Sequence, residues 1–412
     1  MHIASALRIE RKVTESPVAA TSIPVRRIAS VDVYRGFVML LMMAEVLSLE
    51  TVSNKLVGSS FWSFLAFHQS HVPWVGCSLH DMIQPSFTFL VGVVLPYSIA
   101  GRVEKGGKFP ALLRHAVVRS LILIFLGIFL RSMDAKQTYF TFEDTLTQIG
   151  LGYTFLFILG FQSQRVQIGA LVLILVGYWL AFALYPLPGA GFDYAAAGVT
   201  PGWEHNLNGF AAHWNMNTNF AWSFDRWFLN LFPREKPFDY NYGGYQTLSF
   251  IPTLGTMILG LLAGDALKSA TTDKQKLKFF MITGAVLIAM GLLLQFTGIN
   301  PIVKRIWTPA WTLFSGGICF WFLAAFYAVI DVAGKKDWAF ILKIIGVNSI
   351  AAYVIAHVLP NFITDTFRIH IGQNFDLVFG APYATLVSGT LILLVEWLLL
   401  YWMYKKKLFI KI

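Results

Sequence analysis

The chain is far more apolar than a soluble protein. Of its 412 residues, 56% are hydrophobic, 16% are aromatic and 13% are charged, whereas soluble proteins average about a quarter charged residues. This composition excludes a soluble globular domain. The net charge of +10 does not indicate a nucleic-acid partner, because lysine and arginine first set the orientation of a membrane protein. Two cysteines, Cys77 and Cys319, predict neither a disulfide framework nor a zinc cluster.

Repeated apolar runs determine the predicted fold class. Runs of about 17 to 25 residues are long enough to cross roughly 30 Å of hydrocarbon as helices. We therefore expect an all-α, polytopic membrane protein with about 10 to 11 transmembrane helices over residues 28–412. The expected helices lie at 31–49, 82–100, 115–132, 146–161, 166–185, 248–265, 279–297, 309–331, 338–358 and 382–404.

Basic residues predict the orientation. If the N-terminus is cytoplasmic, the cytoplasmic segments hold 23 of the 32 lysines and arginines, and the excess recurs at each cytoplasmic connection. Both termini are therefore expected in the cytoplasm, and residues 50–80 and 186–247 outside. Residues 1–27 are polar and lack the apolar core of a signal peptide, so they are expected to form a cytoplasmic tail.

The long outer segment 186–247 is rich in aromatic residues. A connection of this length is usually functional or disordered. Its aromatic side chains could form an interfacial belt, or apolar faces on which a sugar ring packs. They are Trp203, Trp214, Trp222, Trp227, Tyr240, Tyr242 and Tyr245.

The first expected span contains three charged residues. Asp32 and Arg35 are three residues apart and therefore share one helix face. They form either an ion pair at the helix start or a site for a cytosolic anionic ligand. Glu45 lies about 15 Å further along the helix, towards the outer leaflet. An intramembrane carboxylate there indicates a functional site or a hydrogen bond between packed helices.

Three histidines and a carboxylate follow the first span. His68 and His71 have a metal-like spacing, but Pro73 and Gly76 interrupt any helix that leads on to His80. No second ligand cluster is evident, so we expect no metal. The chain also contains no motif of the serine hydrolases, the Walker nucleotide-binding proteins or the HExxH zinc enzymes.

His71 and Asp81 are the candidate catalytic residues of this segment. Ser78-x-x-Asp81 before an apolar run has the pattern of a capping box, which gives Asp81 a structural alternative. His71 is followed by Pro73 and Trp74 at the expected membrane face. A histidine there suits a general base, because its ordinary pKa of about 6.5 lies near operating pH.

Six short motifs occur in a recognisable order. They are SVDVYRG at 30–36, HVPWVG at 71–76 with DMIQPSFTFLVG at 81–92, LTQIGLGY at 146–153, SFIPTLG at 249–255, NPIVKRIWT at 300–308 and GVNSI at 346–350. In these motifs the chain resembles the transmembrane acyltransferases typified by heparan-α-glucosaminide N-acetyltransferase, over about 30–405. The resemblance departs at Glu45, where relatives carry asparagine, and at Gln148, where they carry arginine.

The resemblance implies a function and roles for individual residues. Acetyl-CoA would be used from the cytosol as a co-substrate, and an amine of an extracytoplasmic amino sugar or glycan would accept the acetyl group. His71 matches the catalytic histidine, and Glu45 or Asp81 would orient its imidazole. The expected donor-binding residues are Asp32, Arg35, Arg102, Arg114 and Arg119, whose arginines could neutralise CoA phosphates. The expected acceptor-binding residues are His68, Trp74, Gln148 and Asn348.

Two other functions remain open from the sequence. A secondary transporter for a sugar or amino sugar would use Glu45 and the histidines to relay protons, although no inverted repeat of interrupted helices is evident. A structural membrane scaffold would not need the polar cluster around His71. Further expectations are a bacterial inner membrane as the location, contact with membrane lipid, and a homodimer as one candidate oligomeric state.

Overall fold

The computed structural model describes residues 28–410, so the predicted tail over 1–27 lies outside the described residues. Within 28–410 the secondary structure is helical, with one isolated antiparallel bridge between Val75 and Val303. The prediction of an all-α polytopic membrane protein is confirmed.

Seven helical segments of the described chain are long and apolar enough to span a membrane. All seven were predicted, with boundaries shifted by a few residues. The main helices of these segments are α4 (Ile83–Val103), α5 (Phe109–Ser132), α7 (Gln164–Ala183), α9 (Phe250–Lys268), α10 (Asp273–Phe296), α11 (Pro309–Phe326) and α15 (Ala384–Lys405).

The ninth predicted span is a broken helix, so the prediction of a continuous helix was wrong there. The first predicted span, 31–49, is confirmed as one helical segment over Ala29–Leu47, and the chain bends directly after it. This segment consists of α1 (Ala29–Met43) and a short 3-10 turn, followed after a 42° bend by α2 (Leu49–Lys55). Ser48 at this bend has left-handed backbone angles, which local sequence rarely signals outside glycine.

The ninth predicted span bends by 73° between α12 (Phe340–Val347) and α13 (Ser349–Val358). Asn348 lies at the break. Its side chain accepts a hydrogen bond from the backbone N–H of Ile410 and donates one to the carbonyl of Leu408, both at 3.0 Å. A tertiary contact with the C-terminal segment therefore accompanies the break.

Four further helices complete the list. The predicted span at 146–161 is α6 (Thr145–Leu159), which is apolar but short. Three others were not predicted as helices, because each has only 9 to 11 residues and is too short to span the hydrocarbon. They are α3 (Ser60–Gln69), α8 (Phe220–Phe228) and α14 (Pro360–His370).

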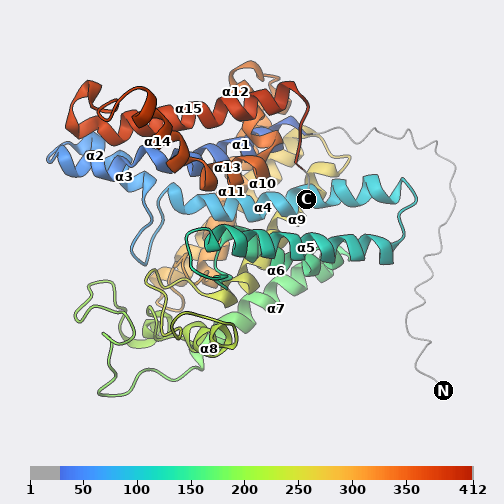
Figure 1. The fold of residues 1–412 in the computed structure, drawn as a ribbon. Coiled ribbons are helices and arrows are strands. Elements are labelled where there is room, and N and C mark those ends of the chain that lie inside the picture. The colour runs from blue at the N-terminus through green and yellow to red at the C-terminus, as the bar shows by residue number, and fades with distance from the viewer. Residues whose placement is uncertain (1–27, 411–412) are drawn as a thin grey trace, which may run out of the picture.

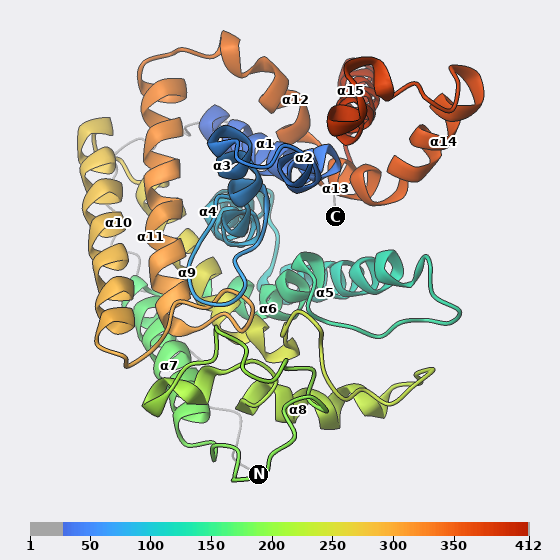
Figure 2. The same cartoon turned by 90° about the vertical axis from the view of Figure 1, so that its left-hand side faces the viewer.

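Helix α4 occupies the centre of the bundle, between α1 and α9 (Figure 2). Glycines allow α4 and α9 to approach closely: a Cβ at Gly260 would overlap the carbonyl oxygen of Phe89, and one at Gly92 would overlap that of Met257. This rigid helix pair carries the residues at the start of α4 that form the candidate site.

The connections gather at the two ends of the bundle (Figure 1). Residues 48–80 and 186–247 lie at one end, which we call the loop-rich end. The α4–α5 connection and the C-terminal end of α15 lie at the other, which we call the opposite end. This segregation agrees with the sides that the charge distribution predicts.

The segment 186–247 folds into a packed cap over the loop-rich end. Trp214 is fully buried and Trp222 nearly so, and Trp214 packs in a cluster with Tyr178 and Phe182 of α7. Of the seven aromatic residues predicted as a belt or a sugar platform, these two instead build the interior of the cap. Trp227 and Tyr242 are exposed.

Candidate functional site

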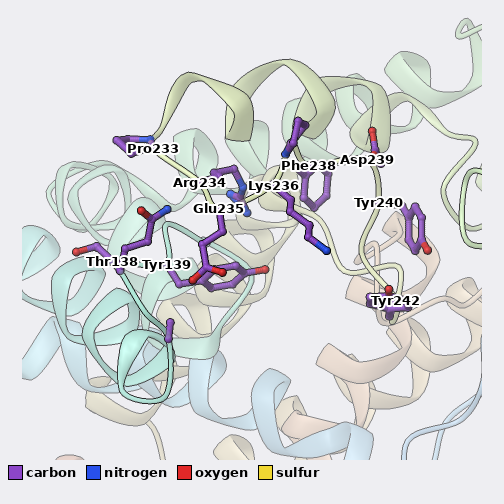
Figure 3. A pocket seen from close by; sticks show the side chains of 13 residues that line it. Thr138, Tyr139, Pro233, Arg234, Glu235, Lys236, Phe238, Asp239, Tyr240 and Tyr242 are labelled. Carbon is purple, nitrogen blue, oxygen red and sulfur yellow. The ribbon is translucent and has the colours of Figure 1, made fainter.

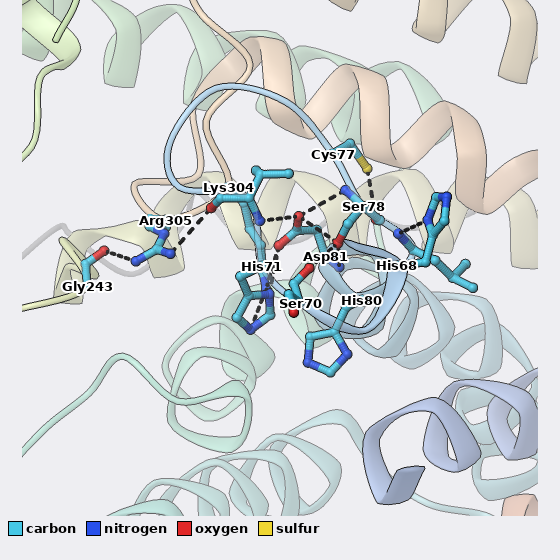
Figure 4. A network of polar contacts seen from close by, with 12 residues as sticks. His68, Ser70, His71, Cys77, Ser78, His80, Asp81, Gly243, Lys304 and Arg305 are labelled. Atoms are coloured by element: carbon cyan, nitrogen blue, oxygen red, sulfur yellow. Dashed lines mark hydrogen bonds and ion pairs between the residues drawn. The ribbon is translucent and has the colours of Figure 1, made fainter. Parts of the chain in front are cut away.

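Three side chains from distant parts of the sequence meet at the loop-rich end (Figure 4). The His71 Nδ1 atom lies 2.8 Å from Oδ1 of Asp81 and 3.0 Å from Nζ of Lys304, and Nζ lies 3.3 Å from Oδ1. The Asp81 and Lys304 side chains are 1% and 5% exposed, whereas that of His71 is 35% exposed. A buried ion pair therefore supports an accessible imidazole.

The two carboxylate oxygens of Asp81 have different partners. Oδ2 accepts a hydrogen bond from the backbone N–H of Ser78 at 3.0 Å, while the backbone N–H of Asp81 donates to Ser78 Oγ at 3.2 Å. This is the reciprocal geometry of a capping box. Oδ1 faces His71 and Lys304. The capping contact therefore uses Oδ2 and leaves Oδ1 for His71 and Lys304.

A backbone contact places Lys304 beside His71. The backbone N–H of Gly76 donates to the carbonyl of Ile302 at 3.1 Å, next to the Val75–Val303 bridge. Gly76 has a φ of +124°, which strongly favours glycine. Thr308 holds the other end of this connection, because its Oγ1 accepts from Val303 N–H at 3.1 Å and donates to the carbonyl of Pro301.

The ionised Asp81 favours one tautomer of His71. Nδ1–H donates to Oδ1, and the Nε2 lone pair remains as an acceptor that faces the site cavity, with Lys304 Nζ 3.4 Å away. Burial lowers the pKa of His71, and the Lys304 charge lowers it further, against the opposing effect of Asp81. Burial also lowers the pKa of Lys304, against the opposing charge of Asp81. His71 is therefore neutral at neutral pH, as a general base must be.

His71 and Lys304 open onto a cavity of about 330 Å³, which we call the site cavity. It extends between α1, the start of α4, the end of α5, the start of α6 and α13. Its polar lining is Glu45, His71, His80, Gln84, Arg131, Glu143, Asp144, Thr145, Tyr245, Lys304, Tyr353 and His357.

An acidic wall forms part of the site cavity. Arg131 Nε donates to Asp144 Oδ1 at 2.7 Å, while Asp144 Oδ2 is buried with no hydrogen-bond partner among the described residues. Asn241 donates to Glu143 Oε2 at 2.8 Å. Burial, followed by the Asp144 charge, raises the pKa of Glu143 to about 7. This wall can accept hydrogen bonds from a polar ligand.

Glu45 contacts a different histidine from the one expected. Its Oε1 lies 3.1 Å from Nε2 of His80, and the rings of His80 and His71 are 4.6 Å apart. Asp81 thus orients His71, while Glu45 lines the site cavity beside it. The expectation that either carboxylate could orient His71 resolves in favour of Asp81.

The four predicted acceptor-binding residues lie outside the lining of the site cavity. The backbone N–H of Leu79 donates to His68 Nδ1 at 3.3 Å, and Trp74 Nε1 donates to the carbonyl of Trp214 at 3.0 Å. Gln148 is buried and donates to the carbonyl of Phe142 at 2.6 Å. Asn348 is bound to the C-terminal segment. These contacts shape the surroundings of the site and do not reach into the cavity.

The predicted donor-binding residues lie on α1, α4 and α5. Arg35 contacts Oδ1 of Asp32 at 3.3 Å and the carbonyl of Gly346 at 3.5 Å, so the predicted ion pair is confirmed. Arg119 donates to the Tyr153 hydroxyl at 3.1 Å. Arg102 is half-buried in the last turn of α4, and Arg114 is exposed on α5.

A separate cavity of about 260 Å³ lies beside the start of α1, lined by Ala29, Val33, Ile330, Lys336, Asp337, Phe340 and Lys343. Its two lysines were not predicted as donor ligands, and none of the five predicted donor residues lines it.

Sequence reasoning missed most of the cavity lining. One feature of the sequence could have indicated Lys304, because a lysine and an arginine interrupt the apolar run Pro301–Trp311. Glu143 and Asp144 precede the LTQIGLGY motif without belonging to it. Within residues 28–410, no group of three or more histidine, cysteine or acidic side chains is arranged to hold a metal ion.

Comparison with known proteins identifies distant relatives. The chain is 23% identical to heparan-alpha-glucosaminide N-acetyltransferase of Homo sapiens and 22% identical to that of Mus musculus. Each alignment covers 94% of this chain but 60% of the relative, so the chain spans about three fifths of their length. No protein-family model matches the chain.

Proposed function

We propose that this chain, a distant homologue of the heparan-alpha-glucosaminide N-acetyltransferases, is a transmembrane acyltransferase that moves an acetyl group from cytosolic acetyl-CoA to an extracytoplasmic amino sugar or glycan. The observation that carries the proposal is the His71–Asp81–Lys304 network, because it presents a neutral, oriented imidazole to a polar cavity. Purified protein incubated with labelled acetyl-CoA and a panel of amino sugars should release CoA and form labelled product.

His71 Nε2 removes the proton that the acceptor loses. As the acceptor nitrogen forms a bond to the acetyl carbonyl carbon, the carbon–sulfur bond of the thioester breaks and the CoA sulfur leaves as thiolate. The acceptor proton passes to Nε2, and Asp81 stabilises the imidazolium through Nδ1–H. The same Nε2 could first accept the acetyl group itself. An acetyl-histidine trapped by rapid acid quench would distinguish this route.

We propose that the donor's nucleotide end binds at the opposite end of the bundle. Arg35 lies there on α1 together with Lys336 and Lys343, whose charges suit phosphate. We expect Arg35→Ala to raise KM for acetyl-CoA about tenfold and to change kcat less. Arg368→Ala is the control, since Arg368 is half-exposed and pairs with Asp365. If Arg35→Ala left KM unchanged but lowered the yield of folded protein, Arg35 would be only a structural partner of Asp32.

The pH dependence of the reaction should report His71. Because the pKa of His71 is lowered, kcat/KM plotted against pH should fall on the acid side at a pH below the ordinary histidine value of 6.5. We call this fall the acid limb. The Lys304 charge lowers this pKa, so Lys304→Met should move the limb to higher pH. Lys55→Met, at an exposed lysine of the loop-rich end, should leave it in place. An acid limb that does not move in Lys304→Met would contradict the coupling.

The orientation that we propose places the loop-rich end outside and both termini in the cytoplasm. It is supported by the basic residues of the opposite end. Phe210 is exposed in the cap, so a Phe210→Cys variant should react with a membrane-impermeant thiol reagent added to intact cells. If the cysteine were labelled only after the cells were permeabilised, the loop-rich end would face the cytoplasm and the proposed orientation would be wrong.

The two bent helix pairs favour a secondary transporter as the alternative function, because interrupted helices are typical of transporter binding sites. The break at Asn348 is, however, bound to the C-terminal segment and not to the site cavity. Uptake of an unmodified amino sugar into proteoliposomes without acetyl-CoA would support the transporter.

A further inference from the structure

A second, larger cavity lies beside the site cavity at the loop-rich end. It measures about 620 Å³ and is lined by residues of two segments, 135–139 and 233–242 (Figure 3). We call it the outer cavity. None of the residues that line it takes part in the network around His71, so the proposed chemistry leaves it without a role.

The same two segments continue into the wall of the site cavity. The first leads from Tyr139 to Glu143, and the second from Tyr242 to Tyr245. Between Tyr240 and Tyr242, which line the outer cavity, Asn241 donates to Glu143 of the site cavity at 2.8 Å. A hydrogen bond therefore joins the linings of the two cavities, which makes them neighbours at the loop-rich end.

The lining of the outer cavity suits uncharged sugar rings. Tyr139 and Tyr242 are exposed, and the rings of Tyr240 and Tyr242 meet edge to face at 5.1 Å. Aromatic faces with a polar rim bind the apolar faces of sugars while hydroxyls find hydrogen-bond partners.

The charges of this lining cancel. Arg234 and Lys236 are balanced by Glu235 and Asp239. The Arg234 guanidinium is also engaged, since it lies over the Tyr139 ring and donates to the carbonyl of Phe140 at 2.9 Å. A strongly anionic chain would meet no excess of positive charge here.

We propose that the acceptor is an oligosaccharide whose terminal amino sugar lies in the site cavity and whose next, uncharged sugar units lie in the outer cavity. This inference rests on the proposed acetyl transfer for the identity of the reacting end. It makes Tyr240 and Tyr242 residues that determine specificity for acceptor length.

Acceptors of increasing length test the proposal. The probes are the methyl glycoside of glucosamine, and a disaccharide and a trisaccharide that carry glucosamine at the non-reducing end of glucose units. We expect kcat/KM to rise about tenfold from the methyl glycoside to the trisaccharide. Tyr240→Ala with Tyr242→Ala should abolish this gain and leave the methyl glycoside within about twofold of wild type.

Trp227→Ala is the matched control, because Trp227 is an exposed aromatic residue of the segment 186–247 that does not line the outer cavity. In this variant kcat/KM should still rise with acceptor length. An equal loss in Trp227→Ala, a trisaccharide no better than the methyl glycoside, or a sulfated trisaccharide preferred over the neutral one would overturn the inference.

Calorimetry with the N-acetylated trisaccharide, without donor, separates this inference from the proposed function. Binding that weakens about tenfold in the double tyrosine variant supports the outer cavity even if no acetyl transfer is found. Transfer to the methyl glycoside, without measurable trisaccharide binding, supports the acyltransferase and overturns the oligosaccharide site.

Discussion

His71→Ala should abolish acetyl transfer while leaving acetyl-CoA binding nearly intact. Loss of a general base typically costs about 10²- to 10⁴-fold in rate, and loss of a covalent carrier can cost more. Donor binding should survive because the segment 48–80, which contains His71, lies at the loop-rich end, whereas the start of α1, which contains Arg35 and the proposed nucleotide site, lies at the opposite end. Initial rates and equilibrium binding of acetyl-CoA measure the two effects.

His68→Ala is the matched control for this variant. His68 belongs to the same segment but accepts a backbone hydrogen bond from Leu79 outside the site cavity. Its loss should lower activity far less than the loss of His71. A His71→Ala protein with activity within about threefold of wild type would remove the catalytic assignment and favour the transporter.

Removing one charge of the buried ion pair between Asp81 and Lys304 should lower the stability of the protein more than removing both charges. Asp81→Asn leaves the Lys304 ammonium buried without a counter-charge, and Lys304→Met does the same to Asp81. Each single change is expected to cost about 3–5 kcal/mol of stability. The double variant should recover most of this stability, because no uncompensated charge remains.

Activity should not recover with stability. Without the Asp81 carboxylate, Nδ1 of His71 loses the acceptor that fixes its tautomer, so we expect about a 10²- to 10⁴-fold loss in rate in both Asp81→Asn and the double variant. Thermal unfolding in detergent and initial rates separate the two effects. A stable double variant with near wild-type activity would show that Asp81 is only a structural residue.

An exposed ion pair provides the control for these measurements. Arg368 and Asp365 are 3.4 Å apart, with side chains 48% and 66% exposed. Neutralising either one should change stability by less than about 1 kcal/mol and leave the rate unchanged.

Composition and periodicity determined the fold class and the placement of most helices. Long apolar runs must become helices in hydrocarbon, since each backbone polar group needs an internal partner there. The same reasoning could not predict the bends at Ser48 and Asn348. Asn348 lies inside an apolar run and Ser48 lies between Glu45 and Glu50. The Asn348 break is held by a hydrogen bond to Leu408, 60 residues away.

The motifs pointed to His71 and Asp81, because a polar cluster at a membrane face is conspicuous against an apolar background. Only the tertiary structure decided their partners. Lys304 reaches the site through the contact of Gly76 with Ile302, and Glu143 through the packing of the segment before α6. Such contacts join residues more than 200 positions apart in the first case, and no local pattern encodes them. The physical reason is that a buried charge such as that of Asp81 must be paired. The tertiary fold, and not the local sequence, determines which residue lies close enough to pair with it.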